Sequence, residues 1–315
     1  GGDILTTSTR KSGRTNRLLH REFAHWQLYL LALPAIIYIL VFCYKPMYGI
    51  VIAFKNFTFR GGIWGSKWVG LYHFKRLFAS YWFPIILRNT LTLSLLSILI
   101  TFPVPIVLAL MVNEVSNARV KKLFQTVSYA PHFISTVVMC GMVILFLKPT
   151  SGLINNFLAA LGQERVYFMQ NPAYFKWIYV LSDVWQNTGW NAIIYFAALS
   201  AIDKEQVEAA EVDGASRMQI ILHVNLPVLV PTIMVMLILK CGQVMNIGYE
   251  KVYLLQNDAN LLGSEVISTF VYKMGIESNE FSFSTATGLL NSVINAIVLV
   301  LANTFSKRVT QSGLW

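Results

Sequence analysis

Charged residues are scarce in this chain. Only 13% of its 315 residues are Asp, Glu, Lys or Arg, and 55% are hydrophobic. Soluble domains usually carry about a quarter charged residues, so the deficit, combined with long apolar runs, indicates lipid rather than water as the main solvent. Cysteine is scarce too. No spacing typical of a zinc site or a disulfide framework is found around Cys43, Cys140 and Cys241.

Signatures of nucleotide binding and catalysis are missing as well. The sequence has no Walker A pattern, no GxGxxG, no HExxH and no GxSxG. We therefore expect no catalytic residue, no metal site and no cofactor bound by this chain.

Apolar runs long enough to cross a bilayer are abundant. A hydrocarbon core about 30 Å thick needs roughly 20 apolar helical residues, and in lipid only helices or closed barrels satisfy the backbone. Runs of this length predict helices, so we expect an all-α membrane protein. The six candidate transmembrane helices are Trp26–Tyr44, Asn89–Val112, Val127–Leu147, Trp177–Ile202, Val224–Ile247 and Phe281–Ser306.

The first run could also be a signal peptide, because it follows a basic stretch. It is 19 residues long, however, and Lys45-Pro46 follows it in place of a small-residue cleavage site, so we expect a retained span. An even number of spans puts both termini on one side of the membrane. With that side taken as the cytoplasm, Lys and Arg are almost evenly divided between inner and outer segments, so the positive-inside rule barely selects an orientation.

The segment 45–84, predicted to lie outside, is unusual in composition. It holds six Lys or Arg residues, no acidic residue, and 12 aromatic residues in 40 positions. Aromatic and basic side chains together suit the headgroup region of a membrane. The same segment could instead form an electropositive rim that attracts an anionic solute. The two interpretations, headgroup contact and an electropositive rim, are compatible.

The polar stretch 203–227 carries local signals for two short helices on the membrane face. Asp203 followed by Gln206 predicts a helix start, and Gly214 is suited to end that helix. A second short amphipathic helix follows, and Leu226-Pro227 opens the next span. The acidic side chains of the first helix surround Ala209 and Ala210, which suits either a solvated surface or docking into a basic groove of another protein.

This stretch resembles the EAA signature of permease subunits of binding-protein-dependent ABC importers. That signature is E-A-A, three residues, G, nine residues, I, any residue, L-P. The chain matches its spacing fully, with Val in place of Ile, at Glu208-Ala209-Ala210, Gly214, Val224 and Leu226-Pro227. Segments 44–57, 88–115 and 264–276 also resemble polysaccharide and oligosaccharide permeases of the carbohydrate-uptake branch, which includes alginate importers.

The resemblance implies a type I importer permease fold with cytoplasmic coupling helices, in the bacterial cytoplasmic (inner) membrane. It divides the chain into a cytoplasmic N-terminal tail (1–25), a first helix with an extracytoplasmic loop (26–84), a permease core (85–306) and a cytoplasmic C-terminal tail (307–315). It also implies that the chain is not an enzyme. The residues that would couple to an ATPase are Glu205, Glu208, Ala209, Ala210, Asp213, Gly214, Leu226 and Pro227.

The resemblance further implies the partners. They are a second permease subunit, expected to be a different homologue, two ABC ATPase subunits that bind ATP and Mg, an extracytoplasmic solute-binding protein and membrane lipid. No nucleic acid partner is expected. Closure of the ATPase dimer would move the coupling helices and switch the bundle from inward- to outward-facing.

Polar residues within the predicted spans are candidates for the substrate pathway, because they are costly in lipid. They could equally hydrogen-bond between helices. The candidates are Trp185, Gln186, Asn187, Trp190, Asn191, Lys240, Gln243, Asn246, Asn291 and Asn295. The charged pair Asp183 and Lys240 lies at similar predicted depth, so we hypothesise that the two residues pair. The alternative is that Lys240 faces the pathway and meets an anionic sugar.

These observations predict the permease of an ATP-driven importer for an oligosaccharide or polysaccharide, and the basic outer segment favours an acidic, alginate-like cargo. An ABC permease for a non-sugar solute would share the EAA signature but not the sugar-branch segments. A secondary transporter would usually carry several ion-coupling carboxylates, whereas the predicted spans hold only Asp183. A membrane enzyme would need a catalytic constellation, and none is found.

Overall fold

The computed structural model describes residues 26–310, so the predicted tail 1–25 and the last five residues of the predicted tail 307–315 lie outside the described residues. The chain forms two compact units, residues 1–51 and 52–315. The first unit contains α2 (Trp26–Tyr38), the π-helical turn η1 (Ile39–Tyr44) and α3 (Lys45–Met47). Together with residues up to Phe54 they make one apolar helical run, Gln27–Phe54, long enough to cross a membrane. This run covers the first predicted span from Gln27 onward and extends beyond its end at Tyr44.

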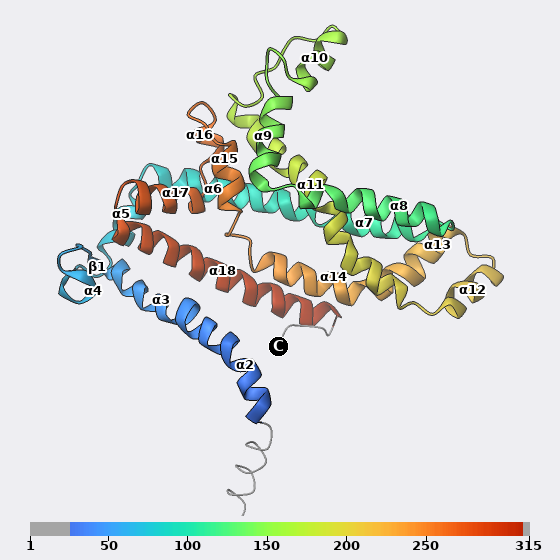
Figure 1. The fold of residues 1–315 in the computed structure, drawn as a ribbon, viewed down its shortest axis with the longest axis horizontal. Coiled ribbons are helices and arrows are strands. Elements are labelled where there is room, and N and C mark those ends of the chain that lie inside the picture. The colour runs from blue at the N-terminus through green and yellow to red at the C-terminus, as the bar shows by residue number, and fades with distance from the viewer. Residues whose placement is uncertain (1–25, 311–315) are drawn as a thin grey trace, which may run out of the picture. The chain divides into compact units, whose positions relative to one another are not determined.

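The second unit is built from helices and one small hairpin (Figure 1). From residue 48 the elements are η2 (Tyr48–Phe54), β1 (Lys55–Asn56), α4 (Gly62–Gly65), β2 (Lys67–Trp68), α5 (Tyr72–Phe78), α6 (Trp82–Leu96), η3 (Ser97–Thr101), α7 (Pro103–Asn113), α8 (Ala118–Tyr129), η4 (Ala130–Phe133), α9 (Thr136–Phe146), α10 (Leu153–Ala160), α11 (Pro172–Ser200), α12 (Lys204–Val212), α13 (Arg217–Ile220), η5 (Ile221–Asn225), α14 (Leu226–Cys241), α15 (Tyr249–Leu255), α16 (Leu261–Ser264), α17 (Ile267–Tyr272), η6 (Lys273–Glu277) and α18 (Phe281–Thr310).

Four helical runs in the described part are long and apolar enough to span a membrane. They are Gln27–Phe54, Trp82–Asn113, Arg217–Cys241 and Phe281–Arg308. A fifth becomes possible if the bent pair Ala118–Phe133 and Thr136–Phe146 crosses as one span. Most of the fourth predicted run, 177–202, lies in α11, which has 29 residues but is not among these four. The structure therefore supports a multi-span helical protein, and the number six stays a prediction.

The third candidate span, Val127–Leu147, is not one continuous helix, although the bent pair that contains most of it can count as one span. The helices on either side of residues 134–135 are bent by 95°. Ile134 and Ser135 are extended, and the Ser135 side chain accepts a hydrogen bond from the Val138 backbone N–H as the cap of a new helix. Pro131, which cannot donate a backbone hydrogen bond, lies just before this break. Local capping therefore overrides the apolar run.

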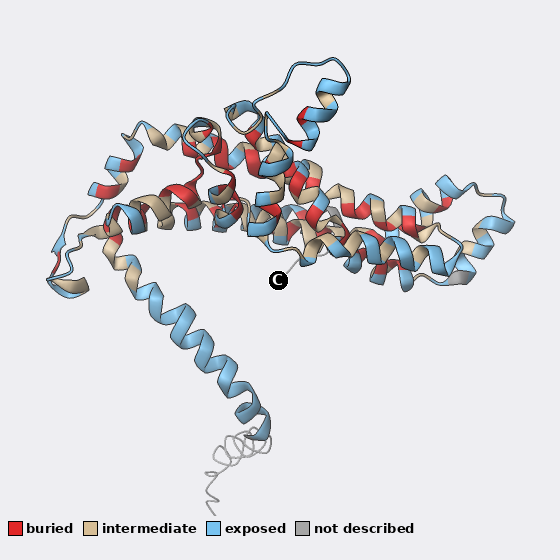
Figure 2. Ribbon diagram, turned by 45° about the horizontal axis from the view of Figure 1, so that its top comes forward, coloured by how far each residue is buried: buried red, intermediate tan, exposed pale blue. Residues whose placement is uncertain are grey.

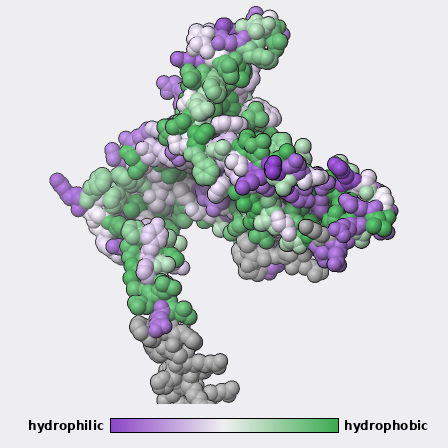
Figure 3. All heavy atoms as spheres, turned by 45° about the vertical axis from the view of Figure 1, so that its right-hand side comes forward, coloured by the Kyte–Doolittle hydropathy of each residue, from purple (hydrophilic) through white to green (hydrophobic). Residues whose placement is uncertain are grey.

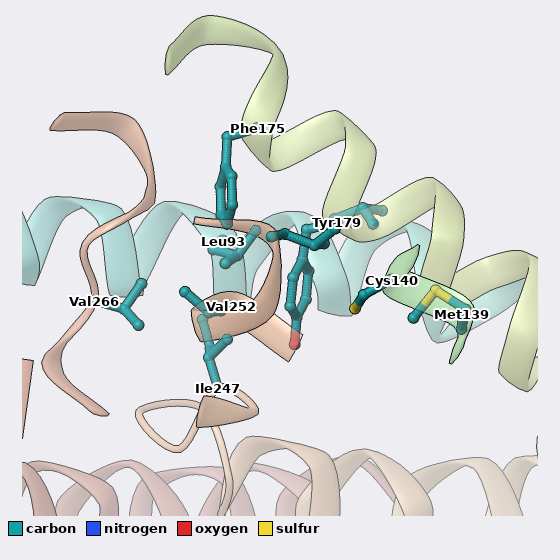
Figure 4. Close-up of a cluster of buried hydrophobic side chains, with 10 residues drawn as sticks. Leu93, Met139, Cys140, Phe175, Tyr179, Ile247, Val252 and Val266 are labelled. Carbon is teal, nitrogen blue, oxygen red and sulfur yellow. The ribbon is translucent and has the colours of Figure 1, made fainter. Parts of the chain in front are cut away.

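The long helix α11 holds the second unit together. Its first half joins a cluster with α6, α9 and α15, in which Phe175, Tyr179 and Val180 are buried. Figure 4 shows Tyr179 pointing from α11 toward the segment that carries Ile247. The second half of α11 packs on α7 and α14 through Ala192 and Tyr195. Figure 2 shows buried residues gathered where helices of the second unit pack together.

Part of the basic and aromatic segment 45–84 is held by contacts within the second unit. Within it, β1 and β2 form an antiparallel hairpin that pairs Lys55 with Trp68, a small exception to the all-α prediction. Arg76 on α5 donates two hydrogen bonds to Glu280, just before α18, at 2.5 and 2.9 Å. This contact lowers the pKa of the Glu280 carboxyl. The side chain of Trp64, in the loop of the hairpin, is 80% exposed, as contact with the headgroup region of a membrane requires.

Helices α8 and α11 come into close contact at Gly189. A Cβ atom at this position would overlap the backbone carbonyl of Ser128, so the approach needs a residue without a side chain. We expect Gly189→Ala to lower the free energy of unfolding by about 1–3 kcal/mol through overpacking, seen as a lower thermal unfolding temperature in detergent. The matched control is Gly288→Ala on α18, where an added Cβ meets no atom within 4 Å. Equal melting of both variants and the parent would contradict this account of the contact.

Candidate functional site

The polar stretch 203–227, here named the coupling loop after the role that the sequence resemblance implies, begins with a well-terminated helix. The Asp203 side chain caps α12 by accepting from the Glu205 backbone N–H at 3.0 Å. Gly214 ends the helix with φ +80°, and the Ala215 N–H donates to the Ala210 carbonyl at 2.9 Å. This six-to-one bond with a left-handed glycine is a Schellman motif. The predicted start and end of this helix are confirmed.

The second half of the coupling loop differs from the prediction of a separate short helix. Ser216 and Gln219 form a capping box at the start of α13. From Arg217 the backbone stays helical through η5 and α14 to Cys241, a run of 25 residues. Pro227 therefore does not open the span. The π-helical turn Ile221–Asn225 precedes it, and such a turn can accommodate the missing proline N–H without breaking the helix.

The α12 face presents acidic, small and apolar side chains to the outside. Exposed on it are the predicted coupling residues Glu205, Glu208, Ala209 and Asp213. Val212 is 88% exposed and Met218 is 62% exposed, and Figure 3 shows hydrophilic and hydrophobic residues mixed at this end of the second unit. Both apolar side chains would be removed from water if another protein covered this surface.

The coupling loop is tied to the rest of the second unit at its C-terminal half. Ile220 is buried, and the buried Asn225 amide donates to the Glu114 carboxylate, at the end of α7, at 3.3 Å. Leu226 is half-buried and Pro227 is exposed. These two predicted coupling residues belong to the α14 run and lie apart in sequence from the exposed α12 surface.

A polar cavity of about 110 Å³ lies where α14 ends. Its walls come from α6 with η3, from α11, from α14 and from the segment 242–248. Three predicted pathway residues gather here. The lining residues are Ser94, Ser97, Ile98, Tyr179, Lys240, Gln243, Val244, Asn246, Ile247 and Gly248.

The segment 242–248 is not helical, although the sequence predicts a span up to Ile247. It is held by side chains of neighbouring helices. The Ser94 hydroxyl donates to the Val244 carbonyl, and Asn295 on α18 accepts from the Met245 N–H at 2.9 Å. Asn291 on α18 donates to Asn246 at 2.9 Å. Asn291 and Asn295 thus tie a non-helical segment to α18, a structural role close to the interhelical hydrogen bonds that the sequence left as an alternative.

The hypothesis that Asp183 pairs with Lys240 is wrong. Asp183 lies 3.5 Å from the ammonium group of Lys251 on α15 and accepts from Asn187 at 2.9 Å. Lys251 is buried and also donates to the Tyr179 carbonyl at 2.9 Å. A buried charge needs such a partner. Lys240 lines the cavity and makes no ion pair with any residue that the structure describes.

The remaining candidates lie around the bend between α8 and α9. Gln186 is buried and donates to the Ile134 carbonyl at 2.9 Å. Asn187 hydrogen-bonds His132 at 2.9 Å, and the Trp190 ring stacks on His132 with centroids 4.4 Å apart. These contacts stabilise the bend. Asn191 is exposed.

Trp185 lines a separate cleft of about 520 Å³. The walls of that cleft come from α9, α10, α11 and residue Phe168 and are almost entirely apolar. The structure therefore does not bring Trp185 together with Lys240. Sequence reasoning also missed Tyr179 and Ser94 as cavity residues. The spacing of Ser94 and Ser97, three apart in an apolar run and so on one helix face, is the signal that could have found the α6 wall.

The chain is similar to a known protein family and to a known permease. Residues 101–311 match the family model of the binding-protein-dependent transport system inner membrane component. The polygalacturonan/rhamnogalacturonan transport system permease protein YteP of Bacillus subtilis (strain 168) is 42% identical over 305 residues, which covers 97% of this chain and 95% of that protein.

Two solved bacterial structures are also similar. One is a crystal structure of an ABC transporter involved in the import of the acidic polysaccharide alginate. It matches with a TM-score of 0.87 and 41% identity, over 93% of this chain and 99% of the other. The second is an alginate ABC transporter in complex with an alginate pentasaccharide-bound periplasmic protein. It matches with a TM-score of 0.88 and 41% identity, over 95% and 100% of the two chains.

The bond between Asn225 and Glu114 gives a direct test of how the coupling loop is held. Glu114→Ala leaves the buried Asn225 amide without its acceptor, so we expect a loss of about 1–3 kcal/mol in the free energy of unfolding. Glu114→Gln keeps a carbonyl oxygen at the same place and is the control. Thermal unfolding in detergent measures both, and equal destabilisation by Ala and Gln would show that this bond does not hold the loop.

Proposed function

This chain belongs to the binding-protein-dependent transport system inner membrane components, and we propose that it is the permease subunit through which an ATP-driven importer moves an acidic oligosaccharide. One observation carries the proposal. The helical run Arg217–Cys241 has the coupling loop at one end and the polar cavity at the other. At about 1.5 Å per residue, such a run extends across the hydrocarbon core of a membrane. A displacement of the coupling loop therefore moves the helix end that lines the cavity.

The proposal includes the partners that the chain itself cannot replace. Two ABC ATPase subunits bind ATP with Mg and hydrolyse it, a second permease subunit completes the translocation path, and an extracytoplasmic binding protein delivers the cargo. The similar alginate transporter forms a complex with a saccharide-bound periplasmic protein, which supports the last of these. Residues 1–25 and 307–315 are cytoplasmic tails in this arrangement, residues 26–84 form the first span and an outer segment, and the core 85–306 supplies five further spans, with α11 and the bent pair α8–α9 among them.

The exposed surface of α12 is the docking element for the ATPase. Glu208 pairs with a basic residue of the ATPase, Ala209 and Ala210 allow close approach, and the left-handed Gly214 fixes the exit of the helix. The C-terminal half of the loop is continuous with α14 and tied to α7, so rigid-body movement of α12 is passed on rather than absorbed.

The cargo enters the cavity beside Lys240. Pockets for small molecules usually measure about 300–1,000 Å³, so a cavity of about 110 Å³ is one part of a site that the second permease subunit completes. Lys240 makes no ion pair with a described residue, which leaves its ammonium group available for a carboxylate. The polymers named for the relatives, polygalacturonan and alginate, carry such carboxylates.

Substitutions in the coupling loop test whether α12 couples this chain to the ATPase. We expect Glu208→Lys to reduce the ATPase activity that the loaded binding protein stimulates in the assembled complex by about tenfold, the effect of roughly 1.4 kcal/mol, while membrane insertion is unchanged. Gly214→Ala should act in the same direction because of its φ of +80°, whereas Gly214→Asn, which tolerates that conformation, retains coupling. Full stimulation in Glu208→Lys would refute the assigned role of α12.

Substitutions of Lys240 test whether the cavity recognises a negatively charged cargo. We expect Lys240→Gln to lower uptake of acidic oligosaccharides by about tenfold and to leave uptake of any neutral oligosaccharide that the complex accepts unchanged, because only the carboxylate contact is lost. Lys240→Arg keeps the charge and is the control. Uptake across a panel of neutral and acidic oligosaccharides in proteoliposomes measures the effect. A parent complex that responds equally to neutral maltodextrins would contradict the acidic assignment.

A further inference from the structure

Three tyrosines form a ring cluster on the far side of the cavity from the coupling loop. Tyr249 and Tyr253 lie one turn apart on α15, with ring centroids 5.4 Å apart and an interplanar angle of 30°. Tyr272, at the end of α17, lies 4.7 Å from Tyr249 and 5.4 Å from Tyr253. Figure 1 shows α15 and α17 away from the α12 end of the second unit. We name these three residues the tyrosine platform.

The tyrosine platform is accessible and polar at its edge. Tyr253 is 38% exposed, and Tyr249 and Tyr272 are half-buried. The Tyr253 hydroxyl donates to the exposed Glu277 carboxylate at 2.9 Å. The contact between the buried rings of Phe270 and Phe283, by contrast, carries no hydroxyl group. Three phenol groups at a surface therefore offer flat apolar faces together with hydroxyl groups that can hydrogen-bond.

The backbone beneath the tyrosine platform is firmly held. Lys251, between the two α15 tyrosines, is buried against Asp183 and the Tyr179 carbonyl. Lys273, directly after Tyr272, bonds the buried Glu265 at 2.6 Å. Ring positions fixed by such anchors lose little conformational entropy when a ligand binds, which favours affinity.

The tyrosine platform also continues the wall of the cavity. Gly248 lines the cavity, and Tyr249 is the next residue along the chain. The Tyr179 hydroxyl, also in the cavity wall, lies against Gly248, 3.5 Å from the position that a Cβ atom on Gly248 would take. A saccharide of several units cannot fit within about 110 Å³, so its further units must contact surface beyond the cavity. The adjoining surface on this side carries the tyrosine platform.

We infer that Tyr249, Tyr253 and Tyr272 form a stacking subsite for a sugar unit of an oligosaccharide whose neighbouring unit occupies the cavity beside Lys240. This inference rests on the proposed function. Pyranose rings present flat C–H faces that pack on aromatic rings, and their hydroxyls bond phenol groups. Glu277 repels a carboxylate at this place, so the platform receives a hydroxyl-rich face while Lys240 receives the charge. The subsite thus selects for chain length.

The test uses the complete transporter, with second permease, ATPases and binding protein, in proteoliposomes. Initial uptake of digalacturonate and of tetragalacturonate is compared in the parent and in Tyr249→Ala, Tyr253→Ala and Tyr272→Ala. We expect each Ala variant to lower tetragalacturonate uptake by about tenfold and digalacturonate uptake by less than about twofold. Tyr253→Phe, which keeps the ring, should retain most of the tetragalacturonate uptake. Tyr174→Ala is the matched control, because Tyr174 is 37% exposed and contacts another ring but lies on α11.

The possible outcomes separate three accounts. The stacking subsite would be overturned if the Ala variants took up tetragalacturonate as fast as the parent does, with digalacturonate uptake also unchanged. Loss of the second permease subunit on purification of the Ala variants would show a subunit interface instead and would also overturn it. A parent complex that takes up neither galacturonate, while another solute stimulates its ATPase, would overturn the proposed function itself.

Discussion

The continuity of the helical run Arg217–Cys241 is the constraint on which the rest of the structure depends. A proline at position 227 would normally break or kink a helix, because it lacks an N–H and its ring meets the preceding turn. Here the π-helical turn Ile221–Asn225 comes just before it, and the run continues. In lipid an interrupted helix would leave backbone groups without partners. One unbroken element consequently joins the exposed loop to the cavity.

The cavity end of this run is as firmly fixed as the loop end. Asn295 and Ser94 hold the non-helical segment 242–248 from two sides. The buried pair of Lys251 and Asp183 fixes α15 on α11. A buried ion pair contributes little net stability compared with apolar packing, but loss of one partner is costly. We interpret this pair as a device that sets the position of α15, which directly follows the cavity residue Gly248.

Local signals in the sequence were sufficient for the first helix of the coupling loop, but not for its second half, which is continuous with α14. A capping Asp203 and a glycine that must adopt positive φ at 214 are encoded within a few residues, so the helix between them could be predicted. The partner of Asp183 could not. Lys251 lies 68 positions away, on a short helix that folds back onto α11, and equal predicted depth had favoured Lys240. Trp185 and Gln186 are adjacent in sequence, yet one lines an apolar cleft and the other bonds the bend at Ile134. Helical periodicity alone cannot tell which neighbour each face will meet.

The central claim is that movement of α12 is transmitted along α14 to the cavity. Its most direct test is solvent access at Gln243, an exposed cavity residue, in proteoliposomes that hold the complete transporter with native cysteines replaced. Labelling of Gln243→Cys by a membrane-impermeant thiol reagent added on the binding-protein side is measured before and after ATP is trapped on the ATPases. The account predicts labelling only in the ATP-trapped state, and loss of this difference when Glu208→Lys is added. Equal labelling in both nucleotide states would contradict it.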